Sequence, residues 1–314
     1  MTEVSSVTEP TMRAQMGRTI EELMDADPRL AVVLADISDG YFERSAAAHP
    51  ERIIRVGIME QTAVSLAAGL ALEGFIPVCH SIAPFIVERP FEQIKDDFCY
   101  QRLGGNFISV GASYDYGTDG MTHQAPGDVP ILRTLPGMEV VVAGTPGEFD
   151  ALFREAYADG APTYFRLHTQ RNAADRPVRF GRLHVEREGS LATVIAVGPM
   201  LDRTLEAADG LDVGVLYCTT VAPFDGETLR ATVHGGGRTD GRSIVIVEPY
   251  YEGTLVPEVV AALGPEPVRI EAIGIPRRVL SRYGGPDEHD ADLGLTADGI
   301  RRRVEAFLAA APRA

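Results

Sequence analysis

One stretch of the chain, residues 53–79, constrains the fold more than any other. It reads IIRVGIMEQTAVSLAAGLALEGFIPVC. A short apolar run is broken by Gly57, an Ala- and Leu-rich segment follows over residues 62–72, and Gly74 separates it from a second apolar run. This order predicts a strand, a helix closed by a left-handed glycine, and a further strand. The helix has so few polar residues that we expect it to be buried.

The same alternation of strands and helices continues along the whole chain. Further strands are predicted at residues 29–35, 106–111, 139–143, 163–167, 191–197, 213–218, 243–248 and 268–273. Helix-like segments separate most of these runs, which indicates βαβ units and mostly parallel sheets. We therefore predict the α/β class, with two consecutive three-layer α/β/α domains. The predicted divisions are a leader (1–12), a first domain (13–172), a polar linker (173–190) and a second domain (191–314).

Composition excludes several classes of partner. The net charge of −16 would repel nucleic acid and anionic membrane surfaces, so we expect neither as a partner. No apolar run approaches the roughly 18 residues of a membrane helix. The N-terminus lacks the layout of a signal peptide, and we expect a cytoplasmic protein. Its three cysteines lack the paired spacing of a metal site and are predicted to be reduced core residues.

Candidate functional residues follow the predicted strands of the first domain. Glu60 comes after a strand and opens a helix, where open α/β sheets bind ligands. It is either a helix-start anion satisfied by backbone N–H groups or a working acid. His123 follows another strand on a glycine-rich loop and could donate to a substrate oxygen, or could simply be a surface histidine.

Three further side chains are candidates for ligand contacts. Phe85 could stack on a flat ligand, although an aromatic residue in such a place is more often part of the core. Arg166 and Arg171 could receive a phosphate at the end of a strand, or could be solvated charges.

Two motifs together resemble a known family. GIMEQ followed by a small-residue helix, and then DGMTHQ at residues 119–124, resemble the thiamine-diphosphate enzymes of the transketolase family. The likeness covers roughly residues 10–311 and is closest to the C-terminal subunit of split transketolases; deoxyxylulose-phosphate synthases share much of it. It implies a pyrimidine-binding domain followed by a transketolase C-terminal domain, the latter usually structural and involved in subunit contacts.

The resemblance also implies roles for individual residues. Glu60 matches the glutamate that shares a proton with N1′ of the cofactor's aminopyrimidine, and a carboxyl in an apolar pocket suits that task. Phe85 matches the aromatic residue that stacks on the pyrimidine, and Ile58 is expected beside it. His123 matches a histidine that donates to the substrate, and Asp119 the acid near the donor's hydroxyl.

Departures from the family pattern concern the substrate. Met59 and Gln61 replace the Arg and His of full-length transketolases, although Glu-Gln itself is common in the split and synthase branches. Gly40 stands roughly where transketolases have a phosphate-contacting Ser, and Ser38 is the nearest substitute. An unusual ketose donor or acceptor is therefore possible.

The sequence lacks the motif that binds the diphosphate of the cofactor in this family. Thiamine diphosphate needs Mg²⁺, held in the family by a Gly-Asp-Gly followed by Asn, and this chain has no Gly-Asp-Gly. We expect no metal ligand in this chain. A partner subunit of the N-terminal type would supply Mg²⁺ and the diphosphate site, most simply as an α2β2 assembly.

The expected activity is transfer of a two-carbon ketol unit between sugars or sugar phosphates. A 2-oxoacid dehydrogenase β subunit and a deoxyxylulose-phosphate-synthase-like enzyme use the same cofactor and stay open as alternatives. So does a non-catalytic scaffold subunit. A nucleotide-dependent dehydrogenase is disfavoured because the glycine fingerprint is missing.

Overall fold

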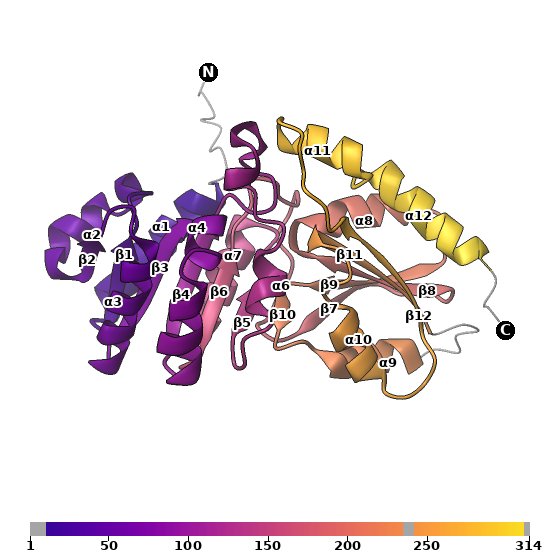
Figure 1. Cartoon of the computed structure of the whole chain (residues 1–314). Coiled ribbons are helices and arrows are strands. Elements are labelled where there is room, and N and C mark those ends of the chain that lie inside the picture. Colours follow the sequence, from indigo (N-terminus) through magenta and orange to yellow (C-terminus); the bar gives the residue numbers. More distant parts are fainter. Residues whose placement is uncertain (1–10, 235–241, 311–314) are drawn as a thin grey trace, which may run out of the picture.

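The computed structural model describes residues 11–234 and 242–310, so most of the predicted leader lies outside the described residues. Two α/β domains lie side by side, each built on a mostly parallel sheet (Figure 1). The strands of the first domain are β1 (Leu30–Leu34), β2 (Ile53–Arg55), β3 (Ile76–Ile82), β4 (Gly105–Val110), β5 (Glu139–Val141) and β6 (Pro162–Arg166). Its helices are α1 (Met12–Ala26), α2 (Glu43–Ala48), α3 (Glu60–Leu72), α4 (Ala83–Val87), α5 (Phe91–Gln93), α6 (Asp128–Leu132) and α7 (Pro146–Ala156).

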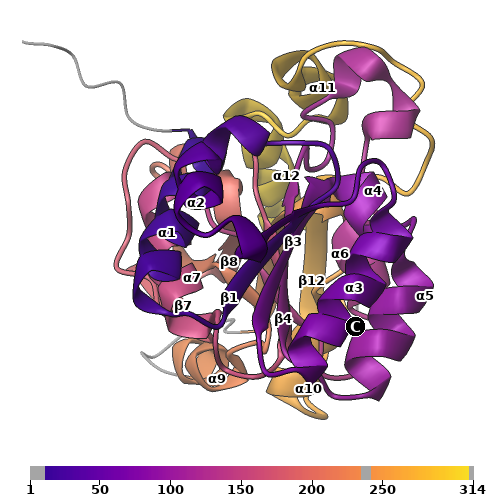
Figure 2. The ribbon, with the colours of Figure 1, turned by 90° about the vertical axis from the view of Figure 1, so that its left-hand side faces the viewer.

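The second domain continues the alternation. Its strands are β7 (Leu183–Arg187), β8 (Ala192–Val197), β9 (Val213–Cys218), β10 (Thr220–Ala222), β11 (Ser243–Tyr251) and β12 (Arg269–Ile275). Its helices are α8 (Leu201–Ala207), α9 (Gly226–His234), α10 (Val256–Leu263), α11 (Pro286–Leu293) and α12 (Ala297–Ala309). Helices cover both faces of each sheet. In the first domain, α1, α2 and α7 lie on one face and α3 to α6 on the other (Figure 2), which confirms the three-layer α/β/α prediction.

Strand order explains where a ligand site can form. The first sheet has the order β10-β5-β6-β4-β3-β1-β2, and the last six of these strands are parallel to one another. The second sheet has the order β12-β11-β8-β9-β7, with only β7 antiparallel to its neighbour. Because the carboxyl ends of parallel strands meet at one edge, the loops after β1, β3, β4 and β6 are brought together there.

Local chemistry fixes the ends of the main helices. Threonine hydroxyls cap three of them: Thr11 accepts from Ala14 N at 3.2 Å at the start of α1. Equivalent caps at α7 and α12 are made by Thr145 and Thr296. Gly74 has φ +88° just after α3, the left-handed conformation predicted from its position. Each of these signals is local, which is why the sequence alone reveals it.

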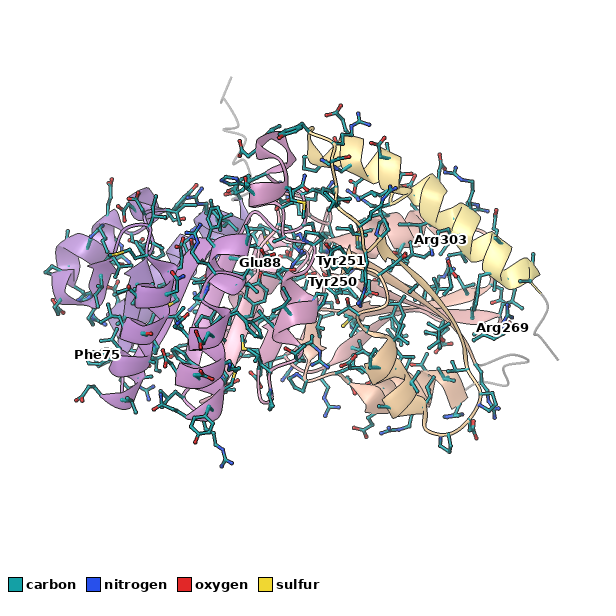
Figure 3. All side chains as sticks on the ribbon, in the orientation of Figure 1. Phe75, Glu88, Tyr250, Tyr251, Arg269 and Arg303 are labelled. Atoms are coloured by element: carbon teal, nitrogen blue, oxygen red, sulfur yellow. The ribbon has the colours of Figure 1, made fainter. Side chains whose placement is uncertain are left out.

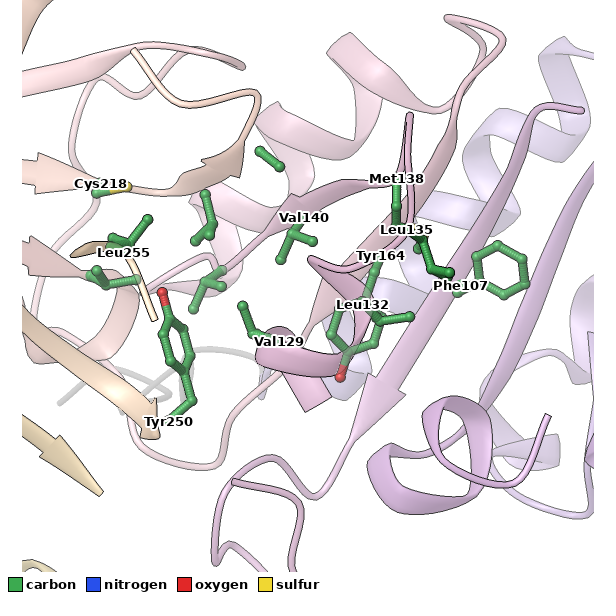
Figure 4. Close-up of a cluster of buried hydrophobic side chains, with 14 of the residues drawn as sticks. Phe107, Val129, Leu132, Leu135, Met138, Val140, Tyr164, Cys218, Tyr250 and Leu255 are labelled. Atoms are coloured by element: carbon green, nitrogen blue, oxygen red, sulfur yellow. The ribbon is translucent and has the colours of Figure 1, made fainter. Parts of the chain in front are cut away.

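The two domains share one apolar core. Figure 4 shows Val129 and Leu132 of α6 gathered with Cys218, Tyr250 and Leu255 of the second domain, and all five are buried. Figure 3 places Tyr250 and Tyr251 in the middle of the molecule, where the domains meet. In addition, β10 leaves the second domain to pair antiparallel with β5 at the edge of the first sheet. The domains are therefore joined by a core and by a sheet.

The structure differs from two sequence-based predictions. The range 173–190 was expected to be a linker, but β7 lies within it and pairs with β9. Its charged and half-buried residues do not show the apolar run of a core strand. The helix now labelled α3 was expected to be buried, but Leu66 and Leu72 are exposed at 37% and 63%. Its small residues pack against the sheet, and its opposite face carries no charge over residues 61–72.

Candidate active site

Glu60 is the first residue of α3 and lies at the carboxyl edge of the first sheet. The turn at Gly57 follows β2 and delivers it there, and the side chain is only 1% exposed. Its Oε1 accepts a hydrogen bond from Ser81 Oγ at 3.2 Å, and its Oε2 accepts one from Arg89 Nη1 at 2.6 Å. Side chains of other segments, Ser81 and Arg89, therefore hold the carboxylate in place.

Phe85 and Arg89 complete a small constellation around this carboxylate. Phe85 lies on α4, and the Arg89 guanidinium lies 4.3 Å from the centre of its ring. One planar cation thus contacts both an aromatic face and the carboxylate of Glu60. Sequence reasoning missed Arg89. Its i, i+4 spacing from Phe85 across a helical turn was the signal that could have identified it.

The loop of residues 113–125, which we call the site loop, brings His123 to the same place. The His123 ring meets Phe85 edge-to-face, with ring centres 5.2 Å apart. Its Nδ1 lies 3.0 Å from Thr122 Oγ1. Asp119 is exposed in the turn Gly117–Asp119, immediately before the turn Met121–His123. The structure therefore gathers Glu60, Phe85 and His123, and leaves Asp119 on the open side of the loop.

Ser38 lies on the opposite face of the sheet from Glu60. It is buried, in the left-handed region at φ 67°, and its Oγ lies 2.6 Å from His80 Nε2. His80 Nδ1 lies 2.8 Å from the carbonyl oxygen of Ile108, so Nδ1 carries the proton and Ser38 donates to Nε2. Arg13 Nε in turn donates to Ser38 Oγ at 2.7 Å. Burial lowers the pKa of His80 to about 4, so the ring is neutral at pH 7.

A cavity of about 390 Å³ opens beside this chain of hydrogen bonds, at the carboxyl ends of β4 and β6. Arg13 and Arg171 line it, together with the rings of Tyr41, Tyr116 and His168. Since adjacent strand residues point to opposite faces, His80 faces this side and Ser81 faces Glu60. The cavity and the Glu60 constellation are therefore on the two faces of one sheet edge.

Arg166 is held in the core at the end of β6. It is fully buried and donates to Asp128 at 2.7 Å, to Ser113 at 2.8 Å and to His168 Nε2 at 2.9 Å. Of the two predicted phosphate ligands, only Arg171 lines the cavity. Arg166 is engaged by Asp128 in a buried ion pair, which explains how a charge is tolerated there.

Exposed apolar side chains lie on the two segments that carry Glu60 and His123. Ile58 and Met59, which precede Glu60, are 69% and 52% exposed, and Met121 on the site loop is 51% exposed. Ile58 was predicted to contact the cofactor; the structure places it in the turn before α3, where its side chain faces outward.

Within the described residues, no group of three or more His, Cys, Asp or Glu side chains could hold a metal ion. A search of the same residues finds no helix whose length and apolarity would let it cross a membrane.

Two family models match most of the chain. The first is the transketolase pyrimidine binding domain, over residues 8–173, and the second is the transketolase C-terminal domain, over residues 181–300.

Among curated proteins, an uncharacterized 33.6 kDa protein in the fasciation locus of Rhodococcoides fascians is 39% identical, covering 98% of this chain and 97% of that protein. The 1-deoxy-D-xylulose-5-phosphate synthase of Desulforudis audaxviator is 33% identical over 92% of this chain. A synthase of the same name from Thermus thermophilus is 30% identical over 95% of this chain. The chain spans about half the length of these two synthases, 47% and 48%.

Solved structures agree with these matches. A split gene transketolase, described as an inactive beta4 tetramer, superimposes with a TM-score of 0.81 at 28% identity, covering 96% of this chain and 99% of that one. A transketolase from Campylobacter jejuni gives a TM-score of 0.76 at 18% identity, covering 94% of this chain and 46% of that one, which is a likeness of fold.

Proposed function

Because the chain belongs to the transketolase family and comprises its pyrimidine-binding and C-terminal domains, we propose that it is the β subunit of a thiamine-diphosphate-dependent transketolase. The reaction is transfer of a two-carbon ketol unit from a ketose or ketose phosphate to an aldose or aldose phosphate. The observation that carries the proposal is that Arg89 links the buried carboxylate of Glu60 to the ring of Phe85, with His123 against the same ring.

These residues fit the aminopyrimidine of the cofactor. Arg89, a planar cation, already contacts both Phe85 and Glu60, so a flat ring with protonatable nitrogens suits the same two partners. When bound, thiamine diphosphate supplies the carbon centre that attacks the ketose carbonyl. Glu60 would hold a proton at the ring nitrogen, Phe85 would orient the ring, and Ile58 would lie at its border.

The remaining residues would handle the substrate. His123 would donate to a hydroxyl or carbonyl oxygen, and Asp119 would accept from a neighbouring hydroxyl. Arg13 and Arg171 line the cavity on the other face of the sheet edge, and two cations there suit the anionic end of a sugar phosphate. Ser38 would act with them through the hydrogen bond that Arg13 donates to it.

A partner subunit of the N-terminal type would complete the enzyme, most simply as α2β2. Three observations support this part of the proposal. The chain spans about half of the related synthases. Ile58, Met59 and Met121 expose apolar surface on the segments that carry Glu60 and His123. The similar split transketolase chain is described as inactive in its β4 form. Mg²⁺ and the diphosphate would be held mainly by that partner.

A second candidate is a deoxyxylulose-phosphate-synthase-like reaction. It is favoured by the two synthases at 33% and 30% identity, and it would use the same residues for cofactor activation. The two reactions differ in the donor, which is a ketose for a transketolase and pyruvate for the synthase. The reconstituted complex should therefore be assayed with both donors.

The first experiment is calorimetric titration of thiamine diphosphate with Mg²⁺ into this chain, and then into the chain mixed with a candidate N-terminal-type subunit. Binding in the mixture alone supports the proposal. Tight binding to the lone chain would contradict a divided site, and the absence of binding in either sample would favour a scaffold role.

A variant test follows from the role of Glu60. In the complex, Glu60→Ala should cost on the order of 10²–10⁴ in rate if this side chain acts as an acid–base group. Glu73→Ala is the matched control, because Glu73 is exposed at the other end of the same helix. Glu60→Ala activity within tenfold of the wild type would refute the assigned role.

A further inference from the structure

We propose that the C-terminal domain positions the site loop, with Tyr114, His289 and Asp290 as positioning residues. We call residues 283–290 the docking segment. It comprises the residues just before α11 and the first turn of that helix, and it lies against the loop. The inference rests on the proposed function only for the roles of Asp119 and His123 on that loop. The contact between the site loop and the docking segment is observed in the structure and does not depend on the proposed function.

The base of the site loop is closed and anchored first. Ala125 N donates to the carbonyl oxygen of Ser113 at 2.7 Å, so the two ends of the loop are paired. The Ser113 hydroxyl donates to the carbonyl oxygen of Pro249 on β11, and it accepts from Arg166 at 2.8 Å. These bonds fix where the loop leaves and re-enters the sheet edge. They do not reach the turns that carry Asp119 and His123.

The outer turns are supported by the docking segment. Gly284 N donates to the carbonyl oxygen of Gly117 at 3.3 Å. A Cβ atom on Gly117 would lie 2.5 Å from the Gly284 oxygen and 2.7 Å from His289 Nε2, and one on Gly120 would lie 2.6 Å from the Tyr283 ring. Only glycine fits such close approach, and Gly120 also needs its positive φ of 74°. The loop is therefore shaped to the segment at two points.

One carboxylate joins the loop to both domains. Asp290 is 3% exposed and accepts from the Tyr114 hydroxyl, from Gln170 Nε2 at 2.5 Å and from Arg203 at 2.9 Å. Tyr114 and Gln170 belong to the first domain, and Arg203 lies on α8 of the second. The ring of His289 stacks on Tyr114 at 4.9 Å. Because Arg203 compensates the buried charge, this arrangement stabilises one position of the loop.

Other contacts hold the two ends of this stretch: the Asp115 carboxylate accepts from Thr169 N at 2.9 Å and from Thr169 Oγ1 at 2.7 Å, and the His123 ring contacts Phe85. Thr118, Asp119, Met121 and Thr122 are all exposed, and the two glycines increase the conformational entropy that ordering must overcome. The second domain adds the constraint between them, at Gly117 and Gly120. His123 would then keep its place against Phe85 because Tyr114, nine positions earlier, is fixed by Asp290.

Hydrogen exchange of the full chain measures this directly and needs no activity. Tyr114→Phe removes only the hydroxyl that Asp290 accepts, and Asp290→Asn removes the charge at the centre of the network. We expect exchange of the backbone amides at 114–123 to rise at least tenfold in both variants, with peptides from β1, β3 and β4 unchanged. Tyr157→Phe is the matched control, since Tyr157 likewise donates to an aspartate, Asp27, at 3.3 Å.

Unchanged exchange in the site loop of Tyr114→Phe would overturn the inference, as would an equal rise throughout the chain. If Asp290→Asn fails to fold, the Tyr114→Phe result still decides. In the reconstituted complex, the loop variants should raise KM for the sugar substrate and leave the affinity for thiamine diphosphate unchanged. A complex inactive even as wild type would count against the proposed function, while the exchange result would still test the positioning role.

Discussion

The guanidinium of Arg89 lies 2.6 Å from the carboxylate of Glu60 and compensates a charge that is almost wholly removed from water. Arg89 itself is about one-third exposed, so the pair is buried on one side only. A pair of this kind has two consequences. It stabilises the free chain, and it uses the carboxylate and the aromatic face to which a flat ligand would bind.

Arg89→Met should therefore change stability and affinity in opposite directions. The methionine keeps an apolar stem but leaves Glu60 without its cation, so the free energy of unfolding should fall by on the order of 2 kcal/mol. Affinity of the complex for thiamine diphosphate should rise, because the ring no longer displaces a bound side chain. Chemical denaturation and calorimetry measure the two effects. Arg55→Met, which breaks the exposed pair with Asp39, is the control expected to change neither.

His123→Ala should separate substrate handling from cofactor binding. Loss of a positioned proton donor costs about 10²-fold or more in kcat/KM. The affinity for thiamine diphosphate should change by less than about tenfold, because the edge contact with Phe85 contributes about 0.5–1.5 kcal/mol. Steady-state kinetics with saturating cofactor test this expectation. An equal loss in cofactor affinity would instead assign His123 to the ring site. His49→Ala, at the residue that follows α2, serves as the reference variant.

Stability should fall as pH rises because of one buried acid of the second domain. Burial raises the pKa of Glu248 to about 8, and its carboxylate accepts from the backbone N–H groups of Gly253, Thr254 and Leu255. In the unfolded chain the group titrates near 4.5, so between pH 4.5 and 8 the folded state binds the extra proton. The stabilisation from this proton is fully present below pH 4.5, and it is lost as the pH rises through about 8.

Denaturation of the wild type and of Glu248→Gln at several pH values measures that slope. One proton contributes at most about 1.4 kcal/mol per pH unit. The wild type should lose stability relative to the glutamine variant between pH 5 and 8. Parallel curves for the two proteins would show that Glu248 is ionised throughout this range.

The three cysteines should be unreactive in the native protein. Burial raises the pKa of Cys218 to about 12 and that of Cys99 to about 11, and it raises the pKa of Cys79 further. Since the thiolate is the reactive form, iodoacetamide at pH 8 should label none of them before denaturation and all three after it. Mass spectrometry counts the adducts. Rapid native labelling of Cys99, the least buried of the three, would contradict the expectation.

Features set by neighbouring residues could be predicted from the sequence. The break at Gly57, the end of α3 at Gly74 and the threonine caps depend on a few adjacent positions, and so does the place of Glu60 at a strand end. The pairing of β10 with β5 could not be predicted in this way, because the partners lie far apart in the chain. β7 was missed because its residues are charged and only half-buried.

The residues of the candidate site also fall into those that local motifs indicate and those that depend on distant contacts. Glu60, Phe85 and His123 could be proposed from motifs, and the structure brings all three together. Arg89 was missed, because an arginine at a helix end usually faces solvent, although its i, i+4 spacing from Phe85 could have identified it. The bond between Tyr114 and Asp290 spans 176 positions, and no local pattern in the sequence indicates it. Arg166 looked like a strand-end charge, yet burial with Asp128 gives it a place in the core.

The pairing of β10 with the sheet of the first domain has a consequence for attempts to produce the two domains separately. By sequence the strand belongs to the second half, but its hydrogen bonds belong to the first. A fragment ending near residue 180 would therefore present β5 as an open edge, a template for aggregation, and would lose half of the shared core. The boundary between the two matched family domains, near residues 173–181, therefore does not separate two independently folding units. We expect the two pieces to be recoverable only when they are produced together.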